Sequence, residues 1–361
     1  MINKKQVNAI IMECNPFHEG HKNIINIAKN IQNNNILIII MSGNFVQRGE
    51  PAVFDKYYRT KQLLDNGVDL VLELPVEFCL SSAKFFARAN INILNNLNFV
   101  DNLIFGSNIN DINILKNISM KINSSTEKND FINKLKSGMS YPKALSEIIE
   151  YNLSPNDILA VEYINALNEI NSTINPITIE RDTNLKSATK HREEMKNKIT
   201  LDMFSEYLNF KLYHIYKTKK TFNDFYLVNN DFDNKLLKIA DKNMSFTDRA
   251  NILHTKDTTL ANIKRILLNI LLDIKEIDVN NMGYGYNTNY LRILGIKKEA
   301  KYLLKNIFVP YLLSYSKKEL SKYFYNENDI DKSIINNIYA SDLYNNIAKL
   351  DFNEATKKLI D

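Results

Sequence analysis

The sequence contains few cysteines and no long apolar run. Cys14 and Cys79 are the only cysteines among 361 residues, which argues against a disulfide framework and favours a reducing compartment. No stretch reaches the roughly 18 apolar residues that a membrane span requires. The run that follows Lys4 and Lys5 is too short for a signal peptide and is interrupted by Glu13. We therefore expect a soluble, cytoplasmic protein.

A strong charge of either sign is also absent. The chain has 46 Lys and Arg residues against 41 Asp and Glu residues, which gives a formal net charge of +5. This balance is compatible with binding to nucleic acid but does not require it. Asn, Ile and Lys are frequent along the whole chain, which is typical of an AT-rich coding bias, so Lys-rich patches alone carry little weight.

Length and periodicity predict two domains. A chain of 361 residues, 45% of them hydrophobic, exceeds what a single core usually serves. Short apolar runs alternate with amphipathic segments in the first half, which is typical of a parallel α/β sheet with right-handed crossovers. The predicted strands cover residues 7–12, 36–41, 68–74, 102–105 and 176–179. The predicted fold class is α/β, with a Rossmann-like parallel sheet over residues 1–200 and a mainly α-helical domain over residues 201–361.

The second domain is expected to be mainly helical. Strands are hard to find after Leu201, and residues 289–294 read as a helix or a turn. Several basic residues here lie among Tyr and Phe, a pattern that suits RNA phosphates and splayed bases. They are Lys264-Arg265, Lys297-Lys298, Lys301 and Lys317-Lys318. The alternative is an ordinary solvated helix face.

Polar loops follow three of the predicted strands. They cover residues 13–21, 42–48 and 106–107, and each contains glycine. Ligands of parallel α/β sheets bind beyond the carboxyl ends of the strands. We therefore expect the three loops to converge on one ligand-binding crevice.

The first loop ends in the motif His18-Glu19-Gly20-His21, directly before a predicted helix. Its spacing places both imidazoles on one face of the first helical turn, and Gly20 allows a ligand to approach the backbone. The amides and dipole of a helix start favour an anion such as phosphate. An ordinary pair of surface histidines is the alternative. Zinc bound by Cys14, His18 and His21 is disfavoured, because no fourth ligand has a usual spacing and a helix start repels cations.

A second phosphate-binding segment is predicted late in the α/β domain. Residues 187–192, Ser-Ala-Thr-Lys-His-Arg, combine two hydroxyls, helix-start amides and a cation. A plain N-capped helix would look similar. The partnership with His18 and His21 makes the phosphate interpretation specific. Single residues such as Asn156 and Arg181 are weak signals by themselves.

These motifs carry a family resemblance. The HxGH motif with a late Ser-x-Thr-x-x-Arg resembles the nucleotidyltransferase α/β superfamily, whose members bind ATP between the two motifs. Longer segments resemble the tRNA(Met) cytidine acetate ligase family and span nearly the whole chain. They are residues 13–21, 41–52, 66–75, 105–107, 155–159, 263–272 and 291–295.

The resemblance implies an ATP-dependent ligase. Such an enzyme joins acetate to AMP, releases pyrophosphate, and passes the acetyl group to N4 of the wobble cytidine of elongator tRNA(Met), without acetyl-CoA. Its substrates would be ATP, acetate and the tRNA. The helical domain would bind the tRNA. Mg²⁺ would accompany ATP, held mainly by phosphate oxygens, and no protein metal site is expected.

The resemblance also implies the site residues. The catalytic groups would be His18, His21 and Arg192. ATP would be bound by Val7, Asn8, Ala9, Ile10, Ile11, Met12, Glu13, Cys14, Asn15, Pro16, Phe17, His18, Glu19, Gly20, His21, Gly106, Asn156, Arg181, Asp182, Ser187 and Thr189. From their position after the second strand, Arg48, Asp55 and Lys56 are expected to face acetate or the cytidine.

The chain departs from the family pattern at three places. Asn108 stands where an acidic residue is usual, and the segment between Arg181 and Ser187 lacks a Gly and a Tyr. His191 replaces an aliphatic residue. Two alternatives stay open: a small-molecule adenylyltransferase of cofactor synthesis, and a non-catalytic RNA-binding protein on the same fold.

Overall fold

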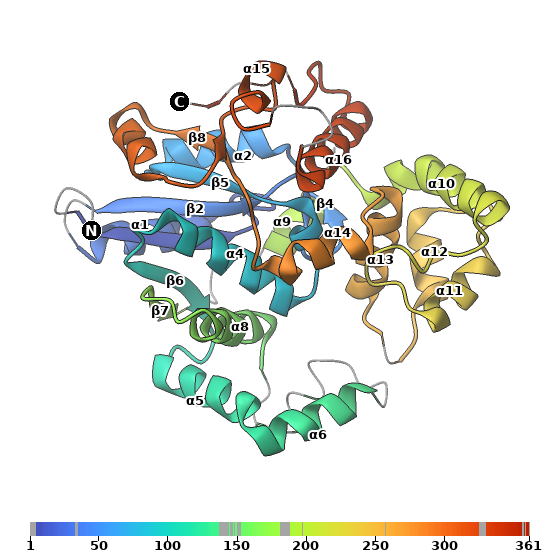
Figure 1. The fold of residues 1–361 in the computed structure, drawn as a ribbon, viewed down its shortest axis with the longest axis horizontal. Coiled ribbons are helices and arrows are strands. Elements are labelled where there is room, and N and C mark those ends of the chain that lie inside the picture. Colours follow the sequence, from blue (N-terminus) through green and yellow to red (C-terminus); the bar gives the residue numbers. More distant parts are fainter. Residues whose placement is uncertain are drawn as a thin grey trace.

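A seven-stranded sheet lies at the centre of the computed structural model (Figure 1). The structure describes residues 5–32, 35–136, 144, 147, 149, 153–180, 188–196, 198–256, 258–324, 330–355, 357, 359 and 360. The strand order is β7-β6-β1-β2-β5-β8-β9. The strands are β1 (Val7–Met12), β2 (Ile36–Ser42), β5 (Leu70–Leu74), β6 (Asn102–Ser107), β7 (Asn175–Glu180), β8 (Leu291–Ile296) and β9 (Tyr311–Leu312).

The first five of these strands in the order, β7 to β5, are all parallel. Every residue of β2 is buried, because a parallel strand is covered on both faces by crossover helices. The apolar runs predicted all five strands, and the α/β prediction is confirmed. A separate two-stranded hairpin joins β3 (Phe45–Val46) to β4 (Glu50–Pro51) within the loop after β2.

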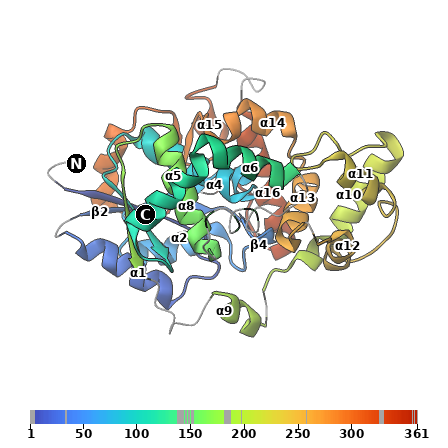
Figure 2. The ribbon, with the colours of Figure 1, turned by 90° about the horizontal axis from the view of Figure 1, so that it is seen from below.

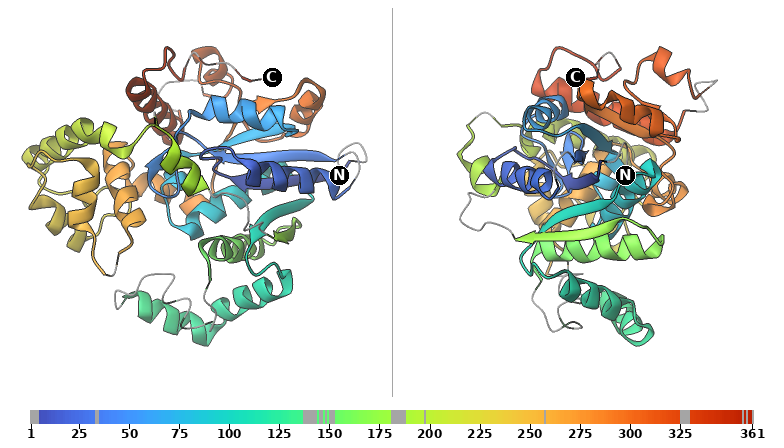
Figure 3. Two further views of the ribbon diagram at one scale, coloured as in Figure 1. Left: turned by 180° about the vertical axis from the view of Figure 1, so that it is seen from behind. Right: turned by 90° about the vertical axis from the view of Figure 1, so that its left-hand side faces the viewer.

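Helices cover both faces of the sheet, as the end-on view in Figure 3 shows. Alternate residues of β1 and β2 point to opposite faces. One face packs against α1 (Glu19–Asn30) and α2 (Lys56–Asp65), and the other against α4 (Ala83–Leu97) and α8 (Pro155–Glu169). Outside α8 lie α5 (Ile112–Asn123) and α6 (Ser125–Lys136), and α9 (Ala188–Glu194) follows β7.

The prediction of helix or turn at residues 289–294 is wrong. These residues enter β8, which pairs antiparallel with β5 and brings Arg292 opposite Glu73. The strand escapes the sequence pattern because Arg292 interrupts its apolar run, and its partner lies more than 200 residues earlier in the chain. The sheet therefore includes strands from both sides of the expected boundary near residue 200.

A helical region lies between the two sheet-forming parts of the chain. In Figure 1, α13 stands between the sheet and the outer helices α10, α11 and α12. Its elements are η1 (Leu201–Phe204), α10 (Ser205–Thr218), α11 (Asn230–Leu237), α12 (Phe246–Leu253), α13 (Leu260–Leu271), α14 (Glu276–Asn281) and η2 (Gly283–Gly285). None of the helices in the described part of the chain is long and apolar enough to cross a membrane.

The chain then returns to the sheet. η3 (Lys298–Asn306) and α15 (Lys317–Leu320) flank β9, and α16 (Lys332–Ala348) packs against α3 (Val76–Cys79). Residues far apart in sequence thus form one framework, and its carboxyl edge carries the loops after β1, β2 and β6.

Candidate active site

The two motif histidines form a reciprocal cap at the start of α1. Nδ1 of His18 accepts a hydrogen bond from the Gly20 amide at 3.0 Å, and Nδ1 of His21 accepts one from the His18 amide at 3.2 Å. The two ring centroids are 4.0 Å apart. Because each Nδ1 is an acceptor, each neutral ring carries its proton on Nε2. The site therefore holds two imidazole N–H donors side by side at a helix start.

Gly20 is required by this cap. A Cβ atom at this position would lie 2.8 Å from Cε1 and 3.0 Å from Nδ1 of His18. Since the imidazole of His18 folds back over the first turn, any side chain at position 20 would displace it.

Helix α9 brings the second phosphate-binding segment to the first. The rings of His18 and His191 are stacked, with centroids 5.4 Å apart. Arg192 donates from Nη1 to the Asn15 carbonyl at 2.6 Å and from Nη2 to Oγ1 of Thr189 at 3.1 Å. Figure 2 shows α9 on the same side of the molecule as α1. The structure thus gathers the two histidines, Thr189 and Arg192, while Ser187, Arg181 and Asp182 lie outside the described residues.

Glu13, at the end of β1, stands among arginines from three segments. Its Oε1 accepts a hydrogen bond from the Gln47 amide at 2.7 Å. Burial raises the pKa of the Glu13 carboxyl, while Arg48, Arg192 and Arg59 oppose the rise. The carboxylate therefore lies in a predominantly positive environment, which suits an anionic ligand.

Arg59 is a structural residue that the sequence analysis missed. It is fully buried on α2 and donates to the carbonyls of Phe54 at 3.0 Å, Glu13 at 2.7 Å and Ser42 at 3.0 Å, and to that of Gly43. These bonds join the carboxyl ends of β1 and β2 to the loop that follows β2. A single arginine inside a helix pattern carries no sequence signal for this role.

Asp157 holds the loop after β6 against the start of α8. Its Oδ1 accepts from Oγ of Ser107 and from the Asn108 amide, both at 2.8 Å. Burial alone would raise the pKa of Asp157, but hydrogen bonds from Ser154, Ser107 and the Ile109 and Asn108 amides hold it below its usual value. The Ser-x-x-Asp capping box that begins at Ser154 is the sequence signal that identifies this residue.

As a result, two predicted nucleoside contacts lie near each other. Gly106 is the last but one residue of β6, and Asn156 is the second residue of α8, directly before Asp157. The Asp157 bonds fix the spacing of these two elements. They also occupy the Asn108 and Ile109 amides, which are therefore not available to a ligand.

The β3–β4 hairpin connects the active-site edge with the helical region. Arg265 of α13 donates from Nη1 to the Gln47 carbonyl at 3.0 Å, and Lys264 pairs with Glu50 at 2.9 Å. Gly49 has a φ of +73°, and a Cβ there would lie 2.8 Å from Cβ of Lys264. This basic pair therefore packs against the hairpin, so neither RNA contact nor a solvated helix face, the two alternatives for it, describes its position.

Two of the three expected substrate-facing residues serve the fold. Oδ1 of Asp55 caps α2 by accepting from the Tyr57 and Tyr58 amides at 2.9 and 3.0 Å. Lys56 is fully buried, with Nζ 2.7 Å from Oε1 of Glu73. Their positions do not support substrate contacts for Asp55 and Lys56. Arg48, at the turn of the hairpin, is exposed.

The stretch predicted to bind ATP, residues 7–21, lies partly inside β1 and partly beyond its carboxyl end. The residues Val7, Asn8, Ala9 and Ile10 are buried inside β1, and a six-residue strand separates its ends by about 17 Å. Val7 lies at the amino end, away from the histidines. The geometry therefore favours the carboxyl part of the stretch, Met12 to His21, as the part that reaches a ligand.

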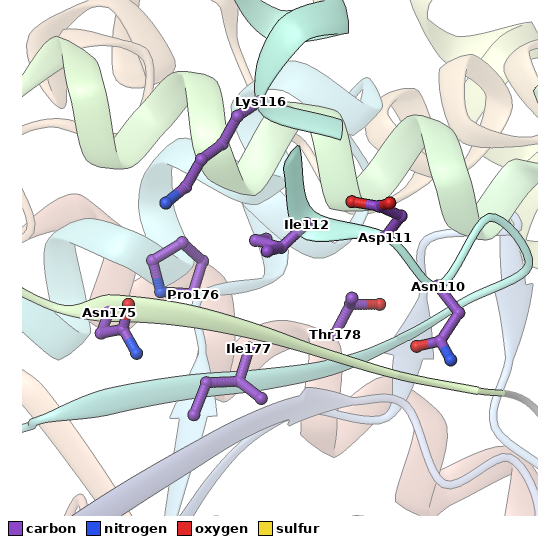
Figure 4. Close-up of a pocket in the computed structure, with 8 residues that line it drawn as sticks. All are labelled: Asn110, Asp111, Ile112, Lys116, Asn175, Pro176, Ile177 and Thr178. Atoms are coloured by element: carbon purple, nitrogen blue, oxygen red, sulfur yellow. The ribbon is translucent and has the colours of Figure 1, made fainter. Parts of the chain in front are cut away.

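A surface hollow lies away from these residues. It has a volume of about 460 Å³ and lies between the start of α5 and edge strand β7; Figure 4 shows the residues that line it. No predicted site residue lines it; the lining residues are Asn110, Asp111, Ile112, Lys116, Asn175, Pro176, Ile177 and Thr178. Within the described ranges, no three His, Cys, Asp or Glu side chains are grouped as metal ligands.

Comparisons with known proteins agree with this architecture. The model of the HIGH Nucleotidyl Transferase family matches residues 5–200 and 183–358. The tRNA(Met) cytidine acetate ligases of Staphylococcus aureus strains JH9 and USA300 are each 32% identical to the chain, over 95% of it and 97% of their own length. Crystal structures of Thermotoga maritima TmcAL, bound with alpha-thio ATP and in the apo state, superpose with TM-scores of 0.89 and 0.86. Each is 25% identical and covers 98% of this chain and 99% of its own.

Proposed function

The chain belongs to the tRNA(Met) cytidine acetate ligase family of HIGH nucleotidyl transferases, and on this premise we propose that it uses ATP to attach acetate to a cytidine of tRNA(Met). The observation that carries the proposal is that α9 places Thr189 and Arg192 next to His18 and His21 at the carboxyl edge of the sheet. A match over 95% of the chain favours the ligase over a cofactor adenylyltransferase.

The proposed reaction has two steps. A carboxylate oxygen of acetate attacks the α-phosphorus of ATP, and the bond to the β-phosphate breaks to release pyrophosphate. The N4 amine of the wobble cytidine of elongator tRNA(Met) then attacks the acetyl carbonyl, loses a proton and displaces AMP. Neither step needs a protein nucleophile. Positioning and stabilisation of negative charge therefore account for the catalysis.

We assign one set of residues to the phosphates of ATP and another to its nucleoside. Nε2–H of His18 and of His21 would donate to phosphate oxygens around the reacting centre, aided by the start of α1. Arg192, Thr189 and Ser187 would hold the phosphates that leave as pyrophosphate. The hydroxyl of Thr189 accepts from Arg192, so its own proton can be donated to a phosphate.

The nucleoside of ATP would lie against the loop after β6. Gly106 and Asn156 come together there through Asp157, and Arg181 and Asp182 are assigned to ATP by family resemblance alone. Mg²⁺ would bind mainly through phosphate oxygens, as this cation keeps few protein ligands. Cys14 and Cys79 are free and buried, which supports a cytoplasmic site of action.

Arg48 is the group we assign to acetate. It is exposed, next to the Gln47 amide that binds Glu13, and it lies close enough to Glu13 and Arg192 to influence the pKa of both. A guanidinium binds a carboxylate with two parallel hydrogen bonds. Of the three residues expected to face a substrate, it is the one that the fold leaves open.

One experiment tests both steps. The protein is incubated with ATP, labelled acetate and tRNA(Met) transcript, and the RNA is analysed for acetylated cytidine. Acetate-dependent exchange of pyrophosphate into ATP is measured in parallel without RNA. Exchange without label in RNA would defeat the modification step alone, and the absence of both would defeat the proposal.

A further inference from the structure

Helix α10 presents an uncovered aromatic stripe to the solvent. Phe210 is 73% exposed, Tyr207 and Tyr213 are 47% and 49% exposed, and Met203 of the preceding η1 is 45% exposed. Exposed large apolar side chains that gather on one element mark interaction sites more often than isolated ones do. The spacing of three and four residues places one line of side chains on a single helix face. In order, the line consists of Met203, Tyr207, Phe210, His214 and Lys217, with Tyr213 beside it.

The core does not need this face. Leu208, Leu212 and Ile215 are buried on the opposite side of α10, where the helix packs against α13. Figure 1 shows α10 at the outer end of the helical region, with α13 between it and the sheet. The stripe therefore points away from every packed layer of the described chain.

The stripe combines aromatic faces with positive charge. The rings of Phe210 and His214 are stacked at 6.3 Å, and Nζ of Lys217 lies 5.4 Å from the centroid of the Tyr213 ring. Lys217, Lys219 and Lys220 are exposed at the carboxyl end of α10, while Asp202 and Glu206 lie at its other end. Aromatic faces that stack bases, with cations that contact phosphates, are the features that bind single-stranded RNA.

The stripe begins beside the active-site edge. Met203 precedes Phe204, whose buried ring contacts Phe45 of the β3–β4 hairpin with centroids 5.6 Å apart. The preceding segment is tied to the phosphate site, because Lys198 donates to the Arg192 carbonyl at 2.7 Å. From there α10 extends over 14 residues, about 21 Å. An RNA strand with one base in the active site could therefore place its neighbouring bases along α10.

We propose that the stripe on α10 binds the single-stranded loop of the tRNA next to the target cytidine, with bases on Tyr207, Phe210 and Tyr213. The inference rests on the proposed function, since it names the surface that receives the RNA substrate. Its chemistry predicts preference for an unpaired loop over a duplex, because stacked base pairs do not offer their faces to a protein ring.

The test is a triple variant, Tyr207→Ala with Phe210→Ala and Tyr213→Ala. Its affinity is measured for a hairpin RNA carrying the anticodon loop of tRNA(Met) and for a blunt duplex of the same stem. We expect the variant to bind the hairpin at least about tenfold more weakly, since each base–aromatic stack contributes substantially. Duplex affinity and acetate-dependent pyrophosphate exchange should stay at the wild-type level, because neither uses the stripe.

Two controls separate stacking from charge and from general exposure. Phe308→Ala removes an aromatic ring that is 83% exposed outside the stripe and should change no measurement. Replacing Lys217, Lys219 and Lys220 by Ala should reduce the salt dependence of binding, as each lost phosphate contact removes released counterions. The aromatic variant should keep the wild-type salt dependence.

Three outcomes would overturn the inference. The first is wild-type hairpin affinity in the triple variant, and the second is an equal loss for hairpin and duplex. The third is unchanged RNA affinity with a change of mass in sedimentation, which would identify the stripe as an interface between copies of the chain. A wild-type protein without acetate-dependent exchange would defeat the proposed function instead, and the binding comparison would still decide the role of the stripe.

Discussion

Two groups of charged side chains lie near the carboxyl edge of the sheet, and one is closed while the other is open. The closed group, here the Lys56 network, joins Lys56 to Glu73 and Glu354, each at 2.7 Å, with Arg292 3.8 Å from Glu354. Its side chains are at most 2% exposed. The network connects α2 and β5 to β8 and the end of the chain, so it stabilises the fold.

The open group, here the Glu13 cluster, consists of Glu13, Arg48 and Arg192. Arg48 is exposed, and Arg192 donates hydrogen bonds to Asn15 and Thr189 next to the cap formed by His18 and His21. Charge density alone therefore does not identify a site in this protein. The Glu13 cluster differs from the Lys56 network in that Arg48 is exposed to solvent, where an anion can reach it.

Breaking the Lys56 network should have the largest effect. Lys56→Met leaves Glu73 and Glu354 buried without the cation that pairs with both, and only Arg292 remains, 3.8 Å from Glu354, so we expect a loss of about 3–5 kcal/mol in the free energy of unfolding. Urea denaturation measures it. Lys61→Met is the matched control on the same helix: it breaks the exposed pair with Asp65 and should cost less than about 1 kcal/mol. Similar losses in both variants would contradict the distinction.

Replacing a histidine of the cap should affect activity far more than stability. His18→Ala removes one of two imidazole donors, and we expect acetate-dependent pyrophosphate exchange to fall about 10²- to 10³-fold, as for other lost transition-state donors. The free energy of unfolding should fall by only about 1 kcal/mol, because the variant loses the side-chain cap of α1. His254→Ala, at the exposed end of α12, is the control and should leave both unchanged. Exchange at the wild-type rate in His18→Ala would remove His18 from the reaction.

Local sequence motifs single out residues beside the open group, whereas none singles out the Lys56 network. His18 and His21 are recognisable because a helix cap is a local pattern, and Thr189 with Arg192 forms a second local pattern. The Lys56 network uses residues from positions 56 to 354, and no local pattern reports such pairs. The same limit explains the missed strand β8 and the missed role of Arg59.

Glu77 differs from the carboxyls of the Lys56 network, because it is buried and accepts hydrogen bonds from uncharged side chains. It is fully buried in α3 and accepts from Oγ of Ser333 at 3.1 Å and Nδ2 of Asn336 at 2.8 Å. Burial raises the pKa of Glu77 to about 7 from an ordinary 4.5, with Asp331 adding to the rise and the hydrogen bonds opposing it. Its protonated form is thus favoured in the folded state.

The pH dependence follows from that direction. The stability that protonated Glu77 contributes is complete below about pH 4.5 and is lost as the pH rises to about 7, a change of about 3 kcal/mol. Glu77→Gln should therefore stabilise the protein increasingly relative to the wild type between pH 5 and pH 8, in urea titrations at each pH. A difference that does not change with pH would show that Glu77 is ionised in the fold throughout.

The smallest expected effect concerns Arg48 and separates the two anions of the open site. Arg48→Ala should raise KM for acetate about tenfold, because a charge-assisted hydrogen bond is lost, and leave KM for ATP unchanged in the exchange assay. Lys22→Ala is the control, an exposed cation on α1 paired with Glu19, and should change neither. Arg48→Lys should recover only part of the affinity, since an ammonium cannot form the paired hydrogen bonds of a guanidinium. An unchanged KM for acetate with a raised KM for tRNA would instead assign Arg48 to the RNA, and the open site would then hold ATP without a protein cation dedicated to acetate.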